Sequence, residues 1–189
     1  MNKEKFRLSN LIFMALCCDM GVFLKKLIAP ATNIVTEVLH IPGGIGTSFS
    51  IMFVLIGAVV VDAPGCATLM SIVQSLIALA IGSTGSMGLL APIGYIVPGI
   101  IIDVFLIILK RIKISRLEQM SIVNALAGVS AALTANLITF NLRGVPLALY
   151  FFVACLSGLI SGILAATVVT RIEPIFANQR YKEQYDNSS

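Results

Sequence analysis

Long apolar segments follow one another along almost the whole chain, and this feature most constrains what the chain can fold into. Six of them approach the roughly 20 apolar residues that a helix needs to cross a bilayer. They cover residues 8–29, 48–62, 66–82, 91–109, 119–140 and 146–170. Only 12% of the residues are charged, against about 25% in soluble proteins. We therefore expect an all-α integral membrane protein, built as a compact bundle of six transmembrane helices.

The apolar segments leave little room for a separate soluble domain, because they occupy nearly everything between Leu8 and Thr170. We predict a single transmembrane domain over residues 1–189, with 171–189 as a cytoplasmic tail. Segment 8–29 follows basic residues as the apolar part of a signal peptide does. It is long, however, and contains an acid and two lysines, so we expect it to stay in the mature protein as a helix.

The basic residues gather on one side of the expected bundle. If the N-terminus is cytoplasmic, ten of the 13 lysines and arginines lie inside: Lys3, Lys5, Arg7, Lys110, Arg111, Lys113, Arg116, Arg171, Arg180 and Lys182. Only Lys25, Lys26 and Arg143 lie outside. The positive-inside rule then places both termini in the cytoplasm. We expect the protein to lie in the plasma membrane of a prokaryotic cell. The net charge of +4 is a topology signal, and no nucleic-acid partner is expected.

Three connections face outward in this orientation, at residues 30–47, 82–90 and 141–145. The first lies in Ala29–Ser50, which contains the only histidine of the chain, an acid, an asparagine, two prolines and three closely spaced glycines. Glycines permit tight turns and a close approach of the backbone to a ligand. We interpret this connection as the gate of a ligand pocket that faces the outside.

Polar and aromatic residues near these connections are the candidate substrate-binding residues. They are Asn33, Glu37, His40, Tyr95, Asn136, Asn141, Arg143 and Tyr150. The alternatives are a solvated loop histidine for His40 and membrane-interface anchors for the tyrosines. Two further polar residues, Gln74 and Asp103, lie within apolar segments, where polar groups are costly. We expect neighbouring helices, rather than a ligand, to satisfy them.

No catalytic constellation is found in the sequence. A phosphate-binding loop needs a lysine after its glycines, and neither glycine cluster has one. A membrane serine protease needs a buried Ser–His pair, but the sole histidine lies in a connection, and Ser157-Gly158 and Ser161-Gly162 have the pattern of helix-packing pairs. Paired acids on one helix and paired metal-binding histidines are also absent. We expect no enzyme activity, no metal site and no cofactor.

Several stretches together resemble a known family. A basic N-terminus before IFMALCCDMGVFLKKLIAP, the HIPGG loop, the run GCATLMSIVQSLIALAIGSTGSMGLL and the PGIIID segment are similar to the substrate-binding S component of energy-coupling factor transporters. The resemblance covers roughly residues 7–172. It implies capture of a vitamin or related micronutrient at an outward-facing pocket, for ATP-driven uptake. It also implies two kinds of partner, namely a membrane coupling subunit (the T component) and two cytoplasmic ATPases.

The family's first helix typically presents an Ala-x-x-x-Ala face to the coupling subunit. Here the matching position reads Ala15-Leu-Cys-Cys-Asp19, which departs from that pattern, and Cys17 and Gly21 are the nearest pair of small residues. The resemblance therefore implies that Ala15, Cys17, Asp19 and Gly21 are the partner-coupling residues.

The candidate pocket residues include one acid, one basic residue, amides and aromatics, so several ligands are chemically compatible with them. A flat polar heterocycle such as a thiamine precursor is one, and a tetrapyrrole such as haem or a corrinoid is another. The alternative from another class is a self-sufficient secondary carrier or channel, in which Asp19 or Asp103 couples to an ion. A third alternative is a structural membrane scaffold, which binds no small molecule saturably.

Overall fold

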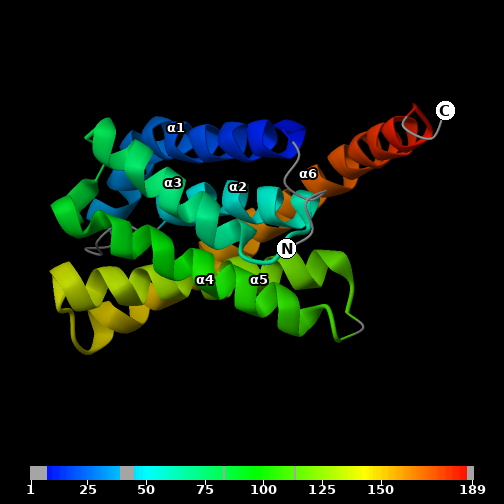
Figure 1. Ribbon diagram of the computed structural model, residues 1–189. Coiled ribbons are helices and arrows are strands. Elements are labelled where there is room, and N and C mark those ends of the chain that lie inside the picture. The colour runs from blue at the N-terminus through cyan, green and yellow to red at the C-terminus, as the bar shows by residue number, and fades with distance from the viewer. Residues whose placement is uncertain (1–7, 39–44, 83, 113, 187–189) are drawn as a thin grey trace.

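The computed structural model describes residues 8–38, 45–82, 84–112 and 114–186. These residues form six α-helices, one 3-10 helix and one π-helical turn, and they contain no strand (Figure 1). In chain order the elements are α1 (Leu8–Val38), α2 (Ile45–Val61), α3 (Cys66–Ala80), η2 (Gly85–Leu90), α4 (Ala91–Leu109), α5 (Arg116–Ala135), η3 (Asn136–Phe140) and α6 (Val145–Asp186). The predicted all-α fold is confirmed.

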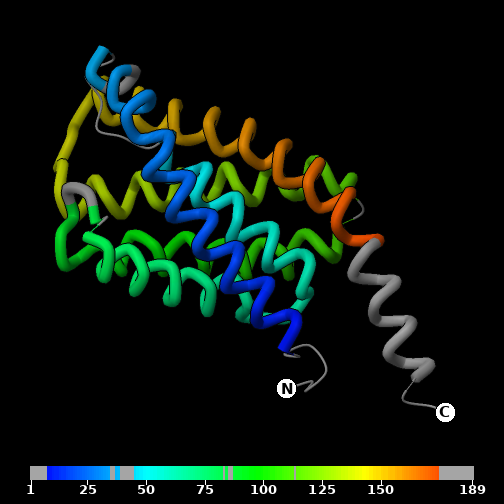
Figure 2. The backbone as a smooth tube through the Cα atoms, turned by 90° about the horizontal axis from the view of Figure 1, so that it is seen from above, coloured from blue at the N-terminus to red at the C-terminus, as the bar shows by residue number. Residues whose placement is uncertain are grey.

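Successive helices alternate in direction, so their connections lie at two ends of the bundle (Figure 2). One end holds the start of α1, the C-terminal part of α6, and the α2–α3 and α4–α5 connections. We call it the basic end because Lys110, Arg111, Arg116 and Arg171 lie there. Two of them form ion pairs, Lys110 with Asp62 and Arg116 with Glu173. The opposite end holds the C-terminal part of α1, η2 and η3.

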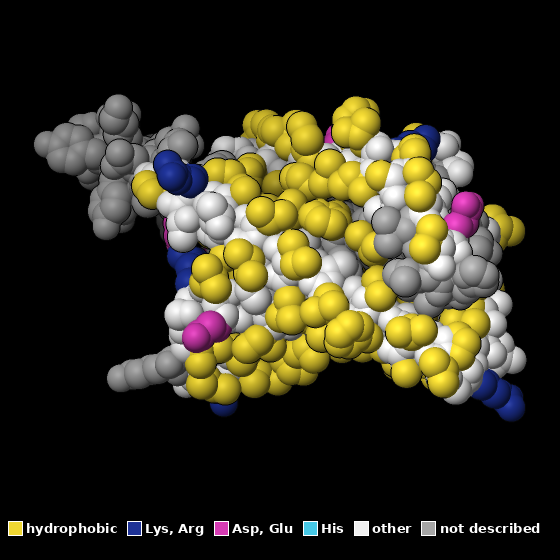
Figure 3. Space-filling model, turned by 180° about the vertical axis from the view of Figure 1, so that it is seen from behind, with side chains coloured by type: hydrophobic (Ala, Val, Ile, Leu, Met, Phe, Trp, Pro, Cys, Tyr) yellow, Lys and Arg dark blue, Asp and Glu magenta, His cyan; other side chains and the backbone are white. Residues whose placement is uncertain are grey.

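Three helical stretches are long and apolar enough to cross a membrane. They are Met87–Leu109, Arg116–Phe140 and Val145–Pro174, whereas α2 and α3 are apolar but shorter. In Figure 3, hydrophobic side chains cover the middle of the visible face, and most of its charged side chains lie near the two ends. This distribution is the one expected of a bundle surrounded by lipid. The helices therefore indicate a membrane protein.

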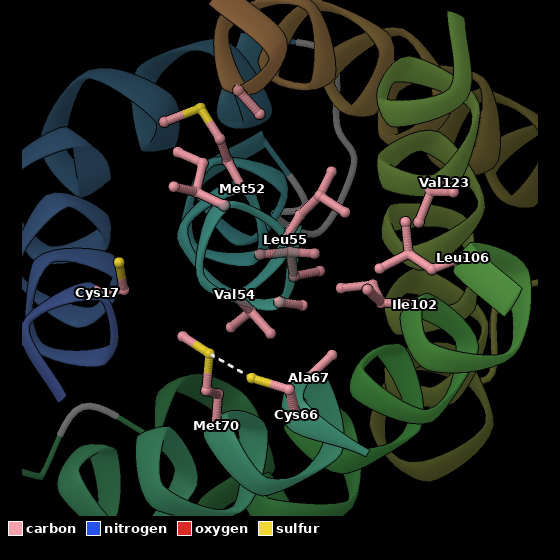
Figure 4. Close-up of a cluster of buried hydrophobic side chains, with 14 of the residues drawn as sticks. Cys17, Met52, Val54, Leu55, Cys66, Ala67, Met70, Ile102, Leu106 and Val123 are labelled. Carbon is pink, nitrogen blue, oxygen red and sulfur yellow. Dashed lines mark hydrogen bonds between the residues drawn. The ribbon is translucent and has the colours of Figure 1, made fainter. Parts of the chain in front are cut away.

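Helix α2 is the centre of the bundle and contacts α1, α3, α4, α5 and α6. Twelve of its 17 residues are buried. The core around it contains Leu55, Met70 of α3 and Ile102 of α4, all almost completely buried (Figure 4). A Cβ atom added at Gly57 would lie 2.4 Å from Met70 Cε, so the glycine makes room for this methionine. Close packing matters here because the hydrophobic effect does not drive helices together within lipid.

Two glycines set the close approach of α6 to α5. A Cβ atom added at Gly158 would lie 2.6 Å from Ala125 Cα, and one added at Gly162 would lie 2.6 Å from Ser121 Cα. Small residues four positions apart allow two helix backbones to approach closely in this way. The interpretation of the two Ser-Gly pairs as helix-packing pairs is confirmed.

Gln74 and Asp103, two polar side chains inside the apolar segments, bond to neighbouring helices, as predicted. The Asp103 carboxylate of α4 accepts hydrogen bonds from the backbone N–H groups of Ala67 (3.1 Å) and Thr68 (2.8 Å) and from Thr68 Oγ1 (2.6 Å). It thereby satisfies N–H groups that the first turn of α3 leaves without helical partners. Gln74 Nε2 of α3 donates to the Cys18 carbonyl of α1 at 3.4 Å.

The largest difference from the predicted boundaries is at the C-terminal end of α1. Residues 30–38 were predicted to belong to a loop, but α1 continues through Pro30 to Val38. Proline removes one backbone donor and normally disfavours a helix interior. Next to the proline, Thr32 Oγ1 donates to the Ala29 carbonyl at 3.1 Å. The predicted gate therefore has a helical first half, and its residues 39–44 lie outside the described part of the chain.

Candidate functional site

A cavity lies at the end of the bundle opposite the basic end, between α1, α2, α4, α5 and the start of α6. The centres of water-sized molecules can occupy about 60 Å³ of it. A single water needs roughly 10–15 Å³ by the same measure, so the cavity has room for several waters or for part of a small solute. Its polar lining residues are Lys25, Thr47, Thr84, Tyr95 and Tyr150.

Lys25 and Tyr95 join α1 to α4 across this cavity. Lys25 Nζ donates a hydrogen bond of 2.9 Å to Tyr95 Oη and lies 4.7 Å from the centroid of the tyrosine ring. The lysine is half-buried and the tyrosine is buried. A long aliphatic stem lets a lysine on an apolar helix reach a polar site in this way. The contact holds a positive charge at the edge of the cavity, where it also interacts with the aromatic ring.

Small residues of α5 form one wall of the cavity. Gly128, Ala131, Ala132 and Ala135 all line it, and their spacing of three and four residues places them on one helix face. Small residues at this spacing are also typical of close helix packing. Gly128 does pack, since an added Cβ atom would lie 3.0 Å from Ser48 Oγ, but the same face also provides the free space of the cavity.

Tyr150 is the lining residue on the α6 side, and two further aromatic rings pack against it. Tyr150 is buried, and its ring lies 6.2 Å from that of Phe140 in an edge-to-face arrangement and 6.3 Å from that of Phe151 in a stacked one. Such pairs prefer defined orientations and hold one another in place. The Tyr150 side chain therefore presents a fixed surface to the cavity.

Met87 of η2 completes the lining on the α4 side, next to Gly94. A Cβ atom added at Gly94 would lie 2.8 Å from Met87 Sδ, so the glycine lets η2 pack directly onto α4. Methionine is flexible and adapts to irregular surfaces. The part of the lining that Met87 forms is consequently apolar and deformable.

A polar network lies one helical turn below the α5 wall. Ser48 and Ser157 share a hydrogen bond of 2.9 Å, and Asn124 Nδ2 donates to Ser161 Oγ at 2.7 Å and to the Gly158 carbonyl at 3.0 Å. Asn124 is completely buried. Its Oδ1 atom has no hydrogen-bond partner among the described residues. The network links α2, α5 and α6 directly beneath the cavity.

Two of the predicted substrate-binding residues, Tyr95 and Tyr150, line the cavity. Asn136 does not, because its side chain bonds to the backbone of Leu142: Oδ1 accepts from the N–H at 2.7 Å and Nδ2 donates to the carbonyl at 3.5 Å. Asn141 is exposed in the left-handed conformation, with φ of 48°, and Arg143 is exposed. Neither of them is a lining residue. Asn136 thus shapes the connection from η3 to α6.

The three remaining candidates belong to the predicted gate. Asn33 and Glu37 are exposed on the C-terminal part of α1 and are not lining residues of the cavity. His40 lies outside the described residues. The lining residues that the sequence interpretation missed are Lys25, Thr47, Thr84, Met87 and the small residues of α4 and α5. The α5 lining residues recur at a spacing of three and four in the sequence, which places them on one helix face. The same spacing is typical of helix packing, so it does not by itself indicate a cavity.

The four predicted partner-coupling residues divide into two pairs. Ala15 and Asp19 are exposed, and Asp19 forms no hydrogen bond or ion pair with any described residue. Cys17 and Gly21 are buried and face the bundle. A Cβ atom added at Gly21 would lie 2.3 Å from Gln74 Nε2, so this glycine packs against α3. Only the first pair lies on a surface that another subunit can reach.

Comparisons of the chain with models of known protein families, with curated proteins and with solved structures found no match. Within the described residues, no group of three or more histidine, cysteine, aspartate or glutamate side chains could hold a metal ion. The function is therefore argued from the cavity and from the arrangement of the helices.

Proposed function

We propose that the protein is the membrane-embedded substrate-binding subunit of an energy-coupling-factor importer. It captures a vitamin or related micronutrient from outside the cell for ATP-driven uptake. The observation that carries this proposal is the cavity between Lys25, Tyr95, Tyr150 and the small-residue wall of α5. Ligand sites in helix bundles form between helices at positions where a few polar groups converge on apolar walls. The residues of the described cavity have that character.

The orientation of the bundle follows from its charges. In the proposal all six helices cross the bilayer, and the basic end with Lys110, Arg111 and Arg116 faces the cytoplasm. Both termini then lie inside the cell. The cavity, at the opposite end, opens to the outside, where a solute arrives.

Partner subunits supply the energy in this proposal, because the sequence contains no phosphate-binding loop. Helix α1 presents the exposed residues Ala15 and Asp19 together with large apolar side chains such as Leu16, Met20 and Phe23. An uncompensated acid on a membrane-facing helix is costly, so a partner helix that donates hydrogen bonds to Asp19 is favoured there. We therefore assign the contact with the membrane coupling subunit to this face.

Native mass spectrometry of the protein, purified from cells that express it with its natural neighbours, tests the proposal. We expect a bound small molecule, together with co-purified coupling and ATPase subunits. The same cells should lose uptake of that molecule when the ATPases are removed. Ion-driven uptake by the purified chain alone in liposomes would instead establish a secondary carrier, and the absence of any saturable ligand would leave a structural scaffold.

A further inference from the structure

The charge of the cavity is set by a single side chain. Among the lining residues that the structure describes, Lys25 is the only one with a formal charge. An ammonium group offers three donors and no acceptor, and one of these donors is used by Tyr95 Oη at 2.9 Å. Two donors of a half-buried cation are therefore left for a ligand or for water.

The other polar groups of the lining add to this excess of donors. Tyr95 Oη accepts from Lys25, so its own hydrogen is available to a second acceptor. The hydroxyl groups of Thr47, Thr84 and Tyr150 form no hydrogen bond with any described residue. Hydroxyls can donate or accept, whereas the ammonium can only donate. A ligand group that accepts several hydrogen bonds and carries negative charge can bind the Lys25 ammonium and these hydroxyl groups together.

The shape of the cavity restricts the rest of the ligand. Gly94 and Ala91 of α4 and Gly128, Ala131 and Ala135 of α5 all line it, and their short side chains leave room in the cavity. The Tyr150 ring, held by Phe140 and Phe151, forms a fixed aromatic boundary. A flat ring can occupy such a space and contact the tyrosine, while a bulky or branched group collides with the helix backbones.

We propose that the ligand of this cavity is a small monoanion with a single flat ring, whose acidic group is bound by Lys25 and Tyr95. This inference rests on the proposed function, because it names the chemical class of the captured solute. The carboxylate or similar group takes the free donors of Lys25, and charge-assisted hydrogen bonds of this kind are the stronger ones. The ring lies between α4 and α5.

A matched set of probes tests the assignment. Single-ring carboxylates, namely benzoate, its hydroxy derivatives and the pyridine carboxylates, are titrated into the purified full-length protein beside their neutral amides, with calorimetric detection. We expect at least one acid to bind about tenfold or more tightly than its amide, the size expected for a hydrogen bond to a charged group. Lys25→Met should abolish this preference, and Lys25→Arg should keep it.

Lys26→Met is the control, because Lys26 is the neighbouring lysine, is exposed and is not a lining residue. It should bind the acids as the wild type does. Amides that bind as tightly as the acids, a Lys25→Met variant that still prefers acids, or a panel in which no acid binds would each overturn the assignment. A neutral or cationic molecule found bound in native mass spectra would overturn it while leaving the proposed capture of a solute intact.

Discussion

Lys25 of α1 donates a hydrogen bond of 2.9 Å to Tyr95 of α4, although 70 residues separate them in the chain. This contact crosses the cavity and fixes the C-terminal half of α1 against the rest of the bundle. The same helix leads into the connection that the sequence predicted to be the gate. A ligand that competes for the lysine therefore changes how firmly this part of α1 is held.

Tyr95→Phe should loosen α1 while keeping the aromatic wall of the cavity. The variant removes the acceptor of the Lys25 hydrogen bond and leaves the ring below the ammonium group. We expect a loss of roughly 1.5–3 kcal/mol in local stability, the range for hydrogen bonds to charged groups. Faster amide exchange of residues 22–38 in detergent would show it. Tyr150→Phe removes a hydroxyl that forms no hydrogen bond with Lys25, so it should leave exchange in α1 unchanged. Equal exchange in Tyr95→Phe and wild type would contradict the prediction.

Ala135→Leu should fill the cavity without unfolding the bundle. Ala135 lines the cavity and is only half-buried, so a larger side chain can extend into the free space. We expect the affinity for the co-purified solute to fall by about a hundredfold, which corresponds to roughly 2.8 kcal/mol. The melting temperature should stay close to that of the wild type. Leu133→Phe, at an exposed position of the same helix, is the control and should bind normally. Undiminished binding by Ala135→Leu would place the site elsewhere.

Gly158→Ala should weaken the contact between α5 and α6. The added Cβ atom would lie 2.6 Å from Ala125 Cα and 3.0 Å from the Asn124 carbonyl oxygen, both backbone atoms that cannot rotate away. Overpacking of this kind costs typically about 1–3 kcal/mol. Thermal unfolding in detergent measures the loss. Gly46→Ala is a matched control, because its added Cβ would meet nothing closer than 3.8 Å, and its melting temperature should be unchanged. Equal melting of the two variants would disprove the tight contact.

The helices and their inner polar contacts could be predicted from the sequence because strong physical constraints act on them. Apolar runs of about 20 residues leave few alternatives to helices in a bundle. Polar groups such as Gln74 and Asp103 inside those runs need partners, so neighbouring helices had to supply them. Tyr95 and Tyr150 were among the candidates since aromatic residues at the same end of the bundle lie close together.

Other features depend on three-dimensional relationships that the sequence does not encode locally. Lys25 lies near the outer end of an apolar segment, and only the packing of α1 beside α4 shows that it reaches a tyrosine. Asn136 was predicted to bind ligand from its position near the end of an apolar segment. In the structure, the left-handed turn at Asn141 places the Leu142 backbone within hydrogen-bonding distance of the Asn136 amide. Proline usually ends a helix, so the continuation of α1 beyond Pro30 was not predicted.

Asp103→Asn should destabilise the bundle through the start of α3. The carboxylate accepts three hydrogen bonds, from two backbone N–H groups and from Thr68 Oγ1, and it is partly buried between α3 and α4. An amide keeps one acceptor oxygen and turns a donor toward groups that also donate. We expect a loss of about 1–3 kcal/mol, because leaving such donors unsatisfied costs their full desolvation.

Thermal unfolding of Asp103→Asn should be compared with that of Asp62→Asn. Asp62 is exposed and pairs with Lys110 at the basic end, where an ion pair contributes only about 0–1 kcal/mol. The Asp103 variant should therefore melt at a clearly lower temperature than the Asp62 variant. Addition of salt should narrow the difference between wild type and Asp62→Asn, since salt screens exposed charges, and should leave the effect at Asp103 in place. An Asp103→Asn protein as stable as the wild type would mean that the start of α3 does not depend on this carboxylate.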